Sequence, residues 1–420
     1  MTSLGLEQTP KSPRARSPAA IGRPVVLLAS TCAWPSTSKL ATALDDGGCE
    51  VVVLAPRWHP LNWAKAPSRR FHYSAMRPLA ALDAAILRSR PDLIVACDER
   101  ALEHLQRLHR QTLDDALRAL IERSIGAPDH FAQVTSREAL MAIAARLGVQ
   151  TPAGQVVRSV ADLRRWAETQ PFPWVIKVDG SWGGLGVRIV SNLAEAKRAM
   201  RDLSRRLRPI YVLRRIVLGA DFFSLTPWLH HPAGVITVQS FIQGRPANCA
   251  IAAWRGAALD GIGVEVIASD GDTGPASIVR LASDSRMLEI GSRFVEALEL
   301  SGLIGFDFLI ETATGRAFLL EMNPRATPIS HLRLGRGHDP IGALVAALTE
   351  RPRPDRAPDT LCKTIALFPQ ANLRFPGHPI LASAYSDAPL QDPGLMSALM
   401  RRRPWRIPKT RFSPEPAPAG

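Results

Sequence analysis

The sequence predicts an α/β (α+β) protein in which a parallel, doubly wound sheet is followed by antiparallel sheets. Three observations lead to this fold class. Apolar strands alternate with helical stretches over residues 24–109, a glycine-rich segment separates two short strands near residue 180, and two apolar runs near residue 310 are joined by a short turn. Strand–helix alternation is typical of parallel sheets, whereas two strands joined by a tight turn pair in antiparallel fashion.

The first strand–helix units predict a small α/β domain over residues 23–130. Strands are expected at Pro24–Ser30, Glu50–Ala55 and Asp92–Ala96, and helices at Ser38–Asp46, Leu79–Arg88 and Ala101–His109. The turn after the first strand, Thr31–Pro35, lacks the glycine fingerprint of a dinucleotide site. We therefore expect a domain that does not bind NAD.

The segment Pro173–Val187 combines a short strand, a lysine and a glycine-rich loop. The strand carries Lys177, and Gly183, Gly184 and Gly186 follow it. Glycines let the backbone approach a phosphate closely, and successive N–H groups form an anion-binding concavity. The pattern is neither a P-loop nor a dinucleotide fingerprint. Taken alone, the segment fits a plain glycine hairpin nearly as well as a phosphate loop.

Three oxygen-bearing side chains lie on the two apolar strands that flank the turn Thr312–Gly315. Positions two apart share one face of a strand, so Glu321 and Asn323 are expected to point together and Met322 into the core. An antiparallel pair would bring Asp307 beside Glu321. Mg²⁺ prefers oxygen ligands and is usually held by one or two carboxylates together with substrate phosphates. The pattern predicts a magnesium nucleotide site, and the alternative is a surface hairpin with ordinary polar residues.

Together, the two motifs resemble the ATP-grasp superfamily in their order and spacing, over about residues 130–350. The chain is similar to the ATP-grasp domains of carbamoyl-phosphate synthase large chains and biotin carboxylases. The resemblance implies an ATP-grasp domain over residues 131–352, divided into subdomains at 131–236 and 237–352 and built on antiparallel sheets. It also implies that residues 23–130 are the Rossmann-like pre-ATP-grasp domain that commonly precedes this fold.

The resemblance further implies which residues contact ATP. Arg137 stands where the family usually has a nucleotide-contacting lysine, although Thr135 and Glu138 also fit a local capping box. Gln239 stands where the family often has glutamate, and its side-chain oxygen can accept a hydrogen bond from the adenine amino group. The alternative for residues 238–244 is a buried edge strand. The expected ATP contacts are Arg137, Lys177, Gly183, Gly184, Gly186, Gln239, Phe241 and Ile242.

The metal and substrate assignments follow from the same resemblance. Asp307, Glu321 and Asn323 are expected to hold Mg²⁺, and such oxygen ligands also accept Mn²⁺. Arg325 is expected to bind the substrate carboxylate or its acylphosphate in bidentate fashion, the alternative being an arginine paired with a surface acid. Arg280 is a second candidate near the cleft, and the alternative is a strand residue that faces solvent.

Members of this family typically transfer the γ-phosphoryl group of ATP to a carboxylate, and an amine then displaces phosphate. The expected function is thus an ATP-dependent ligase acting on a small-molecule carboxylate and an amine. A bicarbonate-activating carboxylase or carbamoyl-phosphate-type enzyme is one alternative, and an ATP-binding protein without turnover is another. Dimers are common among such proteins, which leaves a homodimer open.

Composition restricts the remaining possibilities. The net charge of +14 is spread over helices and tails, and without a nucleic-acid-binding motif it indicates a solvated basic surface. No apolar run approaches the roughly 18 residues of a membrane helix. Five scattered cysteines favour the reducing cytoplasm. Residues 1–22 are expected to be a disordered basic arm, and the Pro- and Arg-rich residues 353–420 a partly ordered wrap with a disordered tail.

Overall fold

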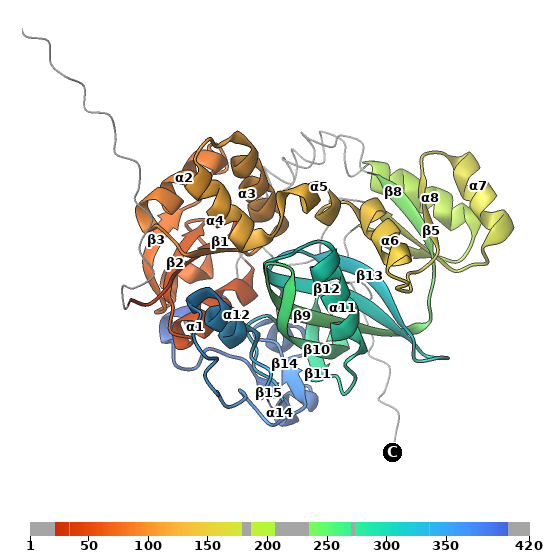
Figure 1. The fold of residues 1–420 in the computed structure, drawn as a ribbon. Coiled ribbons are helices and arrows are strands. Elements are labelled where there is room, and N and C mark those ends of the chain that lie inside the picture. The colour runs from red at the N-terminus through yellow and green to blue at the C-terminus, as the bar shows by residue number, and fades with distance from the viewer. Residues whose placement is uncertain are drawn as a thin grey trace, which may run out of the picture.

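The structure is a computed structural model that describes residues 22–32, 34–178, 186–205, 235–269, 274–335 and 337–401. Within these residues the strands form three sheets (Figure 1). The predicted N-terminal arm, apart from residue 22, and the last residues of the predicted tail lie outside the described residues. No helix in the described part of the chain is both long and apolar enough to cross a membrane.

The first sheet is parallel, with strand order β3-β2-β1-β4. Its strands are β1 (Val25–Ala29), β2 (Glu50–Ala55), β3 (Pro67–His72) and β4 (Leu93–Ala96). Its helices are α1 (Pro35–Asp46), η1 (Pro60–Trp63), α2 (Pro78–Ser89), α3 (Glu99–Gln111) and α4 (Asp115–Ile125). Strands β1 and β4 are buried along their whole length, as expected of a parallel sheet covered on both faces. The parallel sheet predicted from strand–helix alternation is confirmed.

A short helical segment leads from the first sheet to the others. It consists of η2 (Pro128–His130), α5 (Phe131–Val134) and α6 (Arg137–Arg146). The second sheet is antiparallel, with order β5-β8-β6-β7, and stands apart from the first (Figure 1). Its elements are β5 (Gly154–Val157), α7 (Val160–Thr169), β6 (Trp174–Val178), β7 (Val187–Val190), α8 (Leu193–Arg205) and β8 (Ile236–Ser240). Alternate residues of β6 pack against α7 and α8 in one apolar cluster.

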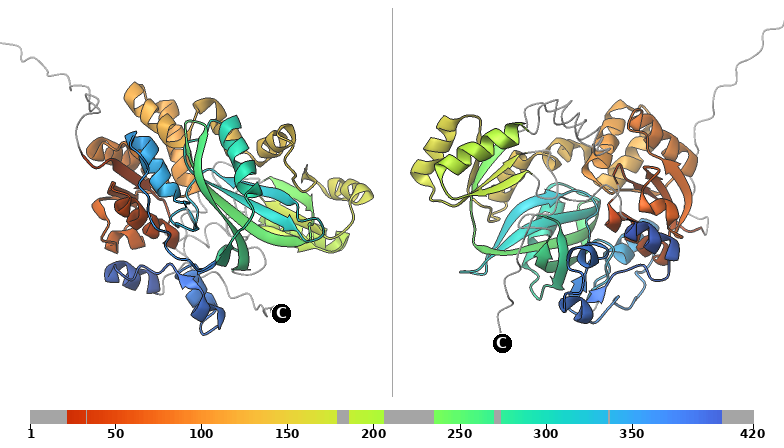
Figure 2. Two further views of the ribbon diagram at one scale, coloured as in Figure 1. Left: turned by 60° about the horizontal axis from the view of Figure 1, so that its bottom comes forward. Right: turned by 180° about the vertical axis from the view of Figure 1, so that it is seen from behind.

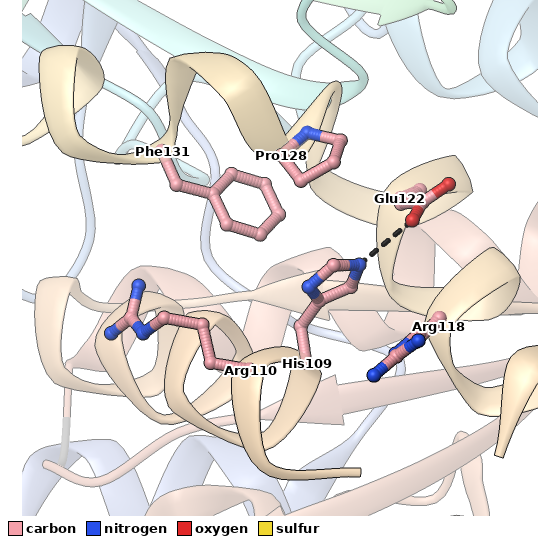
Figure 3. Close-up of a pocket in the computed structure, with 6 residues that line it drawn as sticks. All are labelled: His109, Arg110, Arg118, Glu122, Pro128 and Phe131. Atoms are coloured by element: carbon pink, nitrogen blue, oxygen red, sulfur yellow. Dashed lines mark hydrogen bonds and ion pairs between the residues drawn. The ribbon is translucent and has the colours of Figure 1, made fainter. Parts of the chain in front are cut away.

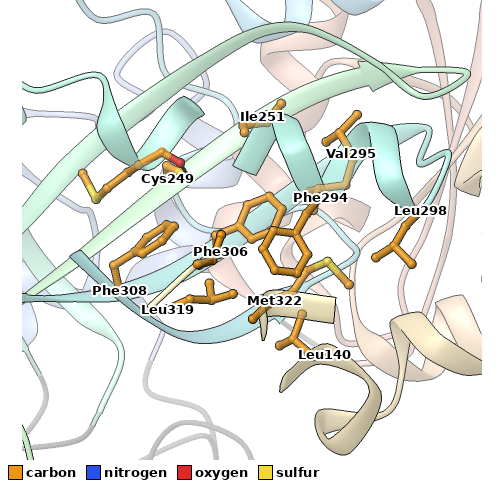
Figure 4. Packing of buried hydrophobic residues seen from close by; sticks show 14 of the residues in the cluster. Leu140, Cys249, Ile251, Phe294, Val295, Leu298, Phe306, Phe308, Leu319 and Met322 are labelled. Carbon is orange, nitrogen blue, oxygen red and sulfur yellow. Dashed lines mark hydrogen bonds between the residues drawn. The ribbon is translucent and has the colours of Figure 1, made fainter. Parts of the chain in front are cut away.

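The third sheet has seven strands in the order β13-β12-β9-β10-β11-β14-β15. Its main elements are β9 (Gly244–Trp254), β10 (Ala257–Ser269), β11 (Ala276–Leu281), α11 (Arg286–Ala297), β12 (Gly302–Glu311), β13 (Ala317–Asn323) and α12 (Pro340–Thr349). Figure 4 shows the core on one face, where Phe294 of α11 lies against Phe306. Met322 is buried in this core, as its position on the strand predicts.

The C-terminal segment is more regular than its proline content predicts. It contains β14 (Thr364–Ala366), α13 (Gln370–Arg374), α14 (Ile380–Ser383), β15 (Tyr385–Ser386) and α15 (Pro393–Met400). The prolines stand at helix starts, with Pro369 and Pro379 as N-caps and Pro393 as a first helical residue, where a missing N–H costs no helical hydrogen bond. The expected partly ordered wrap therefore contains regular helices and strands over residues 364–400.

The first and third sheets share one core. Val26 and Leu28 of β1 belong to the same buried cluster as Leu303 of β12 and Ile341 of α12. The C-terminal elements, drawn in blue, lie beside the first sheet (Figure 2), where Leu395 of α15 packs in one apolar cluster with Ala64, the residue after η1. Ala326, in the loop that follows β13, belongs to the core shared by the first and third sheets, so this loop packs against the first sheet.

Candidate active site

The strands β12 and β13 bring the predicted carboxylates together. Asp307 and Glu321 are direct cross-strand partners in an antiparallel pair. The predicted hairpin is therefore confirmed, and the turn lies between Glu311 and Ala317. Directly opposite side chains in such a pair lie only about 5 Å apart at Cβ. Two carboxylates consequently share one small region of the sheet.

Two amide side chains hold the Asp307 carboxylate. Asn248 Nδ2 donates to one of its oxygens at 2.5 Å, and Asn323 Nδ2 donates to the other at 3.1 Å. Burial and the neighbouring Glu321 charge raise the pKa of Asp307 to about 6, although the two amide bonds oppose this shift. Asn248 was missed by the sequence reasoning. Its only signal was a polar side chain next to the buried run Cys249–Ala253, and the sequence does not show that Asp307 lies opposite it on the adjacent strand.

The donor set fits a divalent cation with oxygen ligands. Asp307 and Glu321 repel one another in a partly buried setting, and a cation between them would remove that repulsion. Asn323 supplies an amide oxygen, which accepts a hydrogen bond from Arg325 Nη2 at 3.2 Å. Among the described residues, no group of three or more His, Cys, Asp and Glu side chains is arranged to hold a metal ion. A metal here would rest on two carboxylates, one amide and ligands from a substrate.

Arg325 joins this cluster to the first sheet. The backbone N–H of Ala326 donates to the carbonyl of Ala96, at the end of β4, at 3.0 Å. Arg325 Nε donates to Glu99 Oε1 at 2.7 Å, and Glu99 is the first residue of α3. Burial opposes the charged guanidinium, but the Glu99 carboxylate raises the pKa of Arg325. Glu99 was also missed, although an acidic residue at the carboxyl end of a parallel strand is a recognisable signal.

Asp98 fixes the loop that presents Glu99. It is fully buried and accepts hydrogen bonds from the Thr31 backbone N–H at 2.6 Å and from Thr31 Oγ1 at 2.8 Å. It also caps α3 by accepting from the Ala101 N–H at 2.9 Å. The turns after β1 and β4 are thereby tied together. The carboxyl edge of the first sheet thus presents a defined surface to Arg325.

Arg137 approaches the cluster from the other side. Its Nη2 lies 3.2 Å from Glu321 Oε1, and its side chain is 17% exposed. The capping box of Thr135 and Glu138, which was the alternative for this segment, is not formed, because Ser136 is the N-cap of α6 and accepts from the Ala139 N–H. Thr135 Oγ1 instead bonds to backbone carbonyls of the preceding helix. Arg137 is therefore the first residue of α6 and contacts a predicted metal ligand.

Arg280 does not join the cluster. It pairs with Glu265 on β10, which in turn pairs with Ala247, and Ala247 pairs with Phe308. Ala247 and Phe308 belong to the core on the α11 face of the third sheet. Because successive strand residues alternate between faces, Asp307 points to the opposite face from Arg280. The expectation that Arg280 lies near the cleft stays a prediction, but its place on the opposite face shows that it does not belong to the Asp307 cluster.

Comparison with known proteins shows which fold the chain shares. No family model matches the chain. Over 240 residues the chain is 27% identical to the carbamoyl phosphate synthase large chain of Thermus thermophilus, a match that covers 55% of this chain and 21% of that protein. The chain therefore spans about a fifth of the length of the curated relatives it matches.

Solved structures extend the similarity to most of the chain. The biotin carboxylase domain of 2-oxoglutarate carboxylase from Hydrogenobacter thermophilus superposes with a TM-score of 0.58 at 14% identity, covering 79% of this chain and 71% of that one. An L-amino acid ligase from Bacillus licheniformis also gives a TM-score of 0.58 at 14% identity, covering 82% and 80%. The chain has an ATP-grasp fold and is related to the ATP-grasp superfamily.

In this ATP-grasp fold, the predicted nucleotide contacts that the structure describes lie on and beside the second sheet, except Arg137 of α6. Lys177 pairs with Thr237, and Val175 pairs with Gln239, so Lys177 and Gln239 share one face of that sheet. Gln239 lies on a strand with a neighbour on each side and is buried, whereas the alternative interpretation placed it on a sheet edge. Phe241 and Ile242 form the connection from β8 to β9, and Gly186 begins the turn into β7, whereas Gly183 and Gly184 lie outside the described residues.

Proposed function

We propose that the protein is an ATP- and Mg²⁺-dependent ligase that activates a carboxylate as an acylphosphate and joins it to an amine. The observation that carries this proposal is the contact chain from Asp307 through Asn323 to Arg325. Together with Glu321, the cross-strand partner of Asp307, it supports a site in which two carboxylates and an amide oxygen lie near a guanidinium that can bind an anionic substrate. The similar structures add support, because one is described as a complex with MgADP, ADP and bicarbonate and another as an L-amino acid ligase.

Each group has a distinct role in this proposal. Asp307, Glu321 and Asn323 would hold the metal, which when bound neutralises negative charge on the phosphates of ATP. Lys177 and the glycine segment before Gly186 would hold the phosphates. Gln239, Phe241 and Ile242 would contact the adenine, and Arg137 would contact the nucleotide from the side of Glu321. Arg325 would bind the substrate carboxylate through two parallel hydrogen bonds.

The reaction needs positioning more than proton transfer by the protein. A carboxylate oxygen attacks the γ-phosphorus, the bond between that phosphorus and the β–γ bridging oxygen breaks, and ADP leaves. The amine nitrogen then attacks the acyl carbon, the bond from that carbon to the phosphate oxygen breaks, and phosphate leaves while the amine loses a proton to solvent. Arg325 would steady the negative oxygens in both steps, in a setting where fixed charges act strongly.

Bicarbonate is the second candidate substrate for the same cluster. It is favoured by the match to carbamoyl phosphate synthase and by the similar biotin carboxylase domain, which is a complex with bicarbonate. Bicarbonate carries the same carboxylate fork that Arg325 can bind, so the geometry of the cluster accepts either anion. The assay below separates the two candidates.

The test measures ADP formation by the full chain with Mg-ATP and pools of carboxylates and amines, followed by mass spectrometry of the products. We expect ADP formation that requires both a carboxylate and an amine, and a condensed product. Glu321→Gln and Asn323→Ala are expected to lower this rate by about 100-fold or more. Glu265→Gln is the matched control, because Glu265 lies on the opposite face of the third sheet and pairs only loosely with Arg245 at 3.5 Å.

Three other results would change the conclusion. ADP formation that depends on bicarbonate alone would establish the second candidate in place of the ligase. Nucleotide binding with no ADP formation from any pool would indicate an ATP-binding protein without turnover. A Glu321→Gln variant as active as the Glu265→Gln control would refute the metal assignment.

A further inference from the structure

A pocket outside the candidate active site lies where α3 and α4 meet the segment formed by η2 and α5. It has a volume of about 380 Å³ and is lined by His109, Arg110, Arg118, Glu122, Pro128 and Phe131. Figure 3 shows these side chains arranged around one opening, with contributions from both helices and from the connecting segment. The volume is within the range of small-molecule sites. None of its lining residues belongs to the carboxylate cluster.

The pocket carries an excess of positive charge. Arg110 and Arg118 come from different helices, and within the described residues no acidic side chain lies within ion-pair distance of Arg110. Arg118 has Asp115 at 3.8 Å, but that carboxylate is 97% exposed and its effect is weakened by solvent. The one carboxylate in the lining, Glu122, already accepts a hydrogen bond from His109 Nε2 at 2.7 Å.

The opposite wall of the pocket is apolar and fixed in place. Phe131 is 5% exposed, and its ring meets the His109 ring edge-on at a centroid distance of 5.3 Å. Its backbone carbonyl accepts a hydrogen bond from Gln106 Nε2 of α3 at 3.3 Å. Pro128 adds a rigid apolar surface beside it. His109 is held in place by Glu122 and by this ring.

We propose that this pocket binds a small organic anion whose charged end lies between Arg110 and Arg118 and whose flat apolar part packs against Phe131 and Pro128. Guanidinium groups match the paired oxygens of a carboxylate or a phosphate, which explains the preference for an anion. The buried ring and the proline favour an organic body over an inorganic ion. The site is separate from the proposed ligase site and does not depend on it.

Benzoate is the probe that tests this site, with acetate and benzyl alcohol as partial mimics. Binding to the full chain is measured by ligand-observed NMR or calorimetry at one fixed ionic strength. We expect benzoate to bind more tightly than either acetate or benzyl alcohol. The double variant Arg110→Gln, Arg118→Gln is expected to weaken benzoate binding about tenfold or more, as loss of charge-assisted hydrogen bonds implies. The double variant Arg164→Gln, Arg201→Gln, which removes two exposed arginines near the second sheet, is the matched control.

A second arm distinguishes this pocket from the carboxylate cluster. Because Arg325 can also bind a carboxylate, benzoate binding is measured in Arg325→Gln and is expected to persist there. Loss of binding in Arg325→Gln, or equal binding in the wild-type chain and the Arg110→Gln, Arg118→Gln variant, would overturn the proposal. Equal affinity for benzoate and benzyl alcohol would also overturn it, since the arginines would then contribute nothing.

Discussion

The sharpest stability prediction concerns Asp387, whose carboxylate joins three distant parts of the chain. It accepts hydrogen bonds from Lys39 Nζ of α1, from His331 Nε2 at 3.0 Å and from the Phe368 N–H at 2.6 Å. Lys39, His331 and Asp387 are all at least nine-tenths buried. Replacing Asp387 by asparagine keeps the shape of the side chain and removes its charge. Lys39 would then be a buried cation without its counter-charge.

Two estimates give the expected loss in the free energy of unfolding. Burial opposes the Asp387 charge, but Lys39 and His331 lower the pKa of the carboxyl from 3.8 to about 2. Because the folded pKa is lowered, this stabilisation is present above pH 3.8 and is lost as the pH falls through about 2. The shift corresponds to roughly 2–3 kcal/mol at neutral pH. Removing one partner of a buried ion pair generally costs about 3–5 kcal/mol. We therefore expect Asp387→Asn to lower the free energy of unfolding by about 3 kcal/mol.

The assay is urea unfolding followed by circular dichroism, combined with hydrogen exchange of the amides of β14 and β15, which flank Asp387 in the fold. Adding Lys39→Met to Asp387→Asn is expected to recover about half of the loss or more, because the buried cation is removed as well. The control is Asp284→Asn, which breaks an exposed pair with Arg286 and should cost less than about 1 kcal/mol. A loss at Asp387 no larger than this control, or no recovery with Lys39→Met, would refute the reasoning.

Three further predictions follow from other contacts. Arg356→Ala should cost about 3 kcal/mol in urea unfolding, because Arg356 binds both oxygens of the buried Asp339, at 2.6 and 2.7 Å, and its loss leaves that charge unpaired; a normal midpoint would contradict this. Glu99→Gln should lower the KM for a carboxylate substrate several-fold by freeing Arg325, and a raised KM would show instead that Glu99 helps to bind substrate. Burial lowers the pKa of His59 to about 3. Between pH 6.5 and about 3, His59 binds a proton only in the unfolded chain. The free energy of unfolding should therefore fall by about 2 kcal/mol from pH 6.5 to 5, and His59→Gln should reduce this dependence on pH.

The parts of the site that could be predicted are those encoded locally. Asp307 and Glu321 face each other because strand alternation and one short turn determine their pairing, and both signals lie within about twenty residues. Asn248 and Glu99 contact the same cluster from another strand and from another sheet. Their positions depend on which elements become neighbours in the fold. A single sequence does not specify that arrangement.

Two parts of the structure could not be predicted from local sequence, for different physical reasons. Arg280 was expected near the cleft, but the pairing of β11 with β10 decides which face of the third sheet it occupies. The C-terminal segment was expected to be only a partly ordered wrap because of its prolines. Proline is disfavoured in the interior of helices and strands but not at the start of a helix. Here Pro369, Pro379 and Pro393 stand at helix starts.

The pairing of β14 with β11 also constrains how the chain can be synthesised. β11 is complete after Leu281, but the partner for its outer edge is made only at Thr364–Ala366. Until then, a ribosome-bound chain carries an unpaired strand edge, which is a template for intermolecular pairing. A stalled or cleaved product that lacks these three residues should therefore aggregate or recruit chaperones. Residues 364–366 thus cover the outer edge of β11, in the sheet whose opposite end carries the candidate active site.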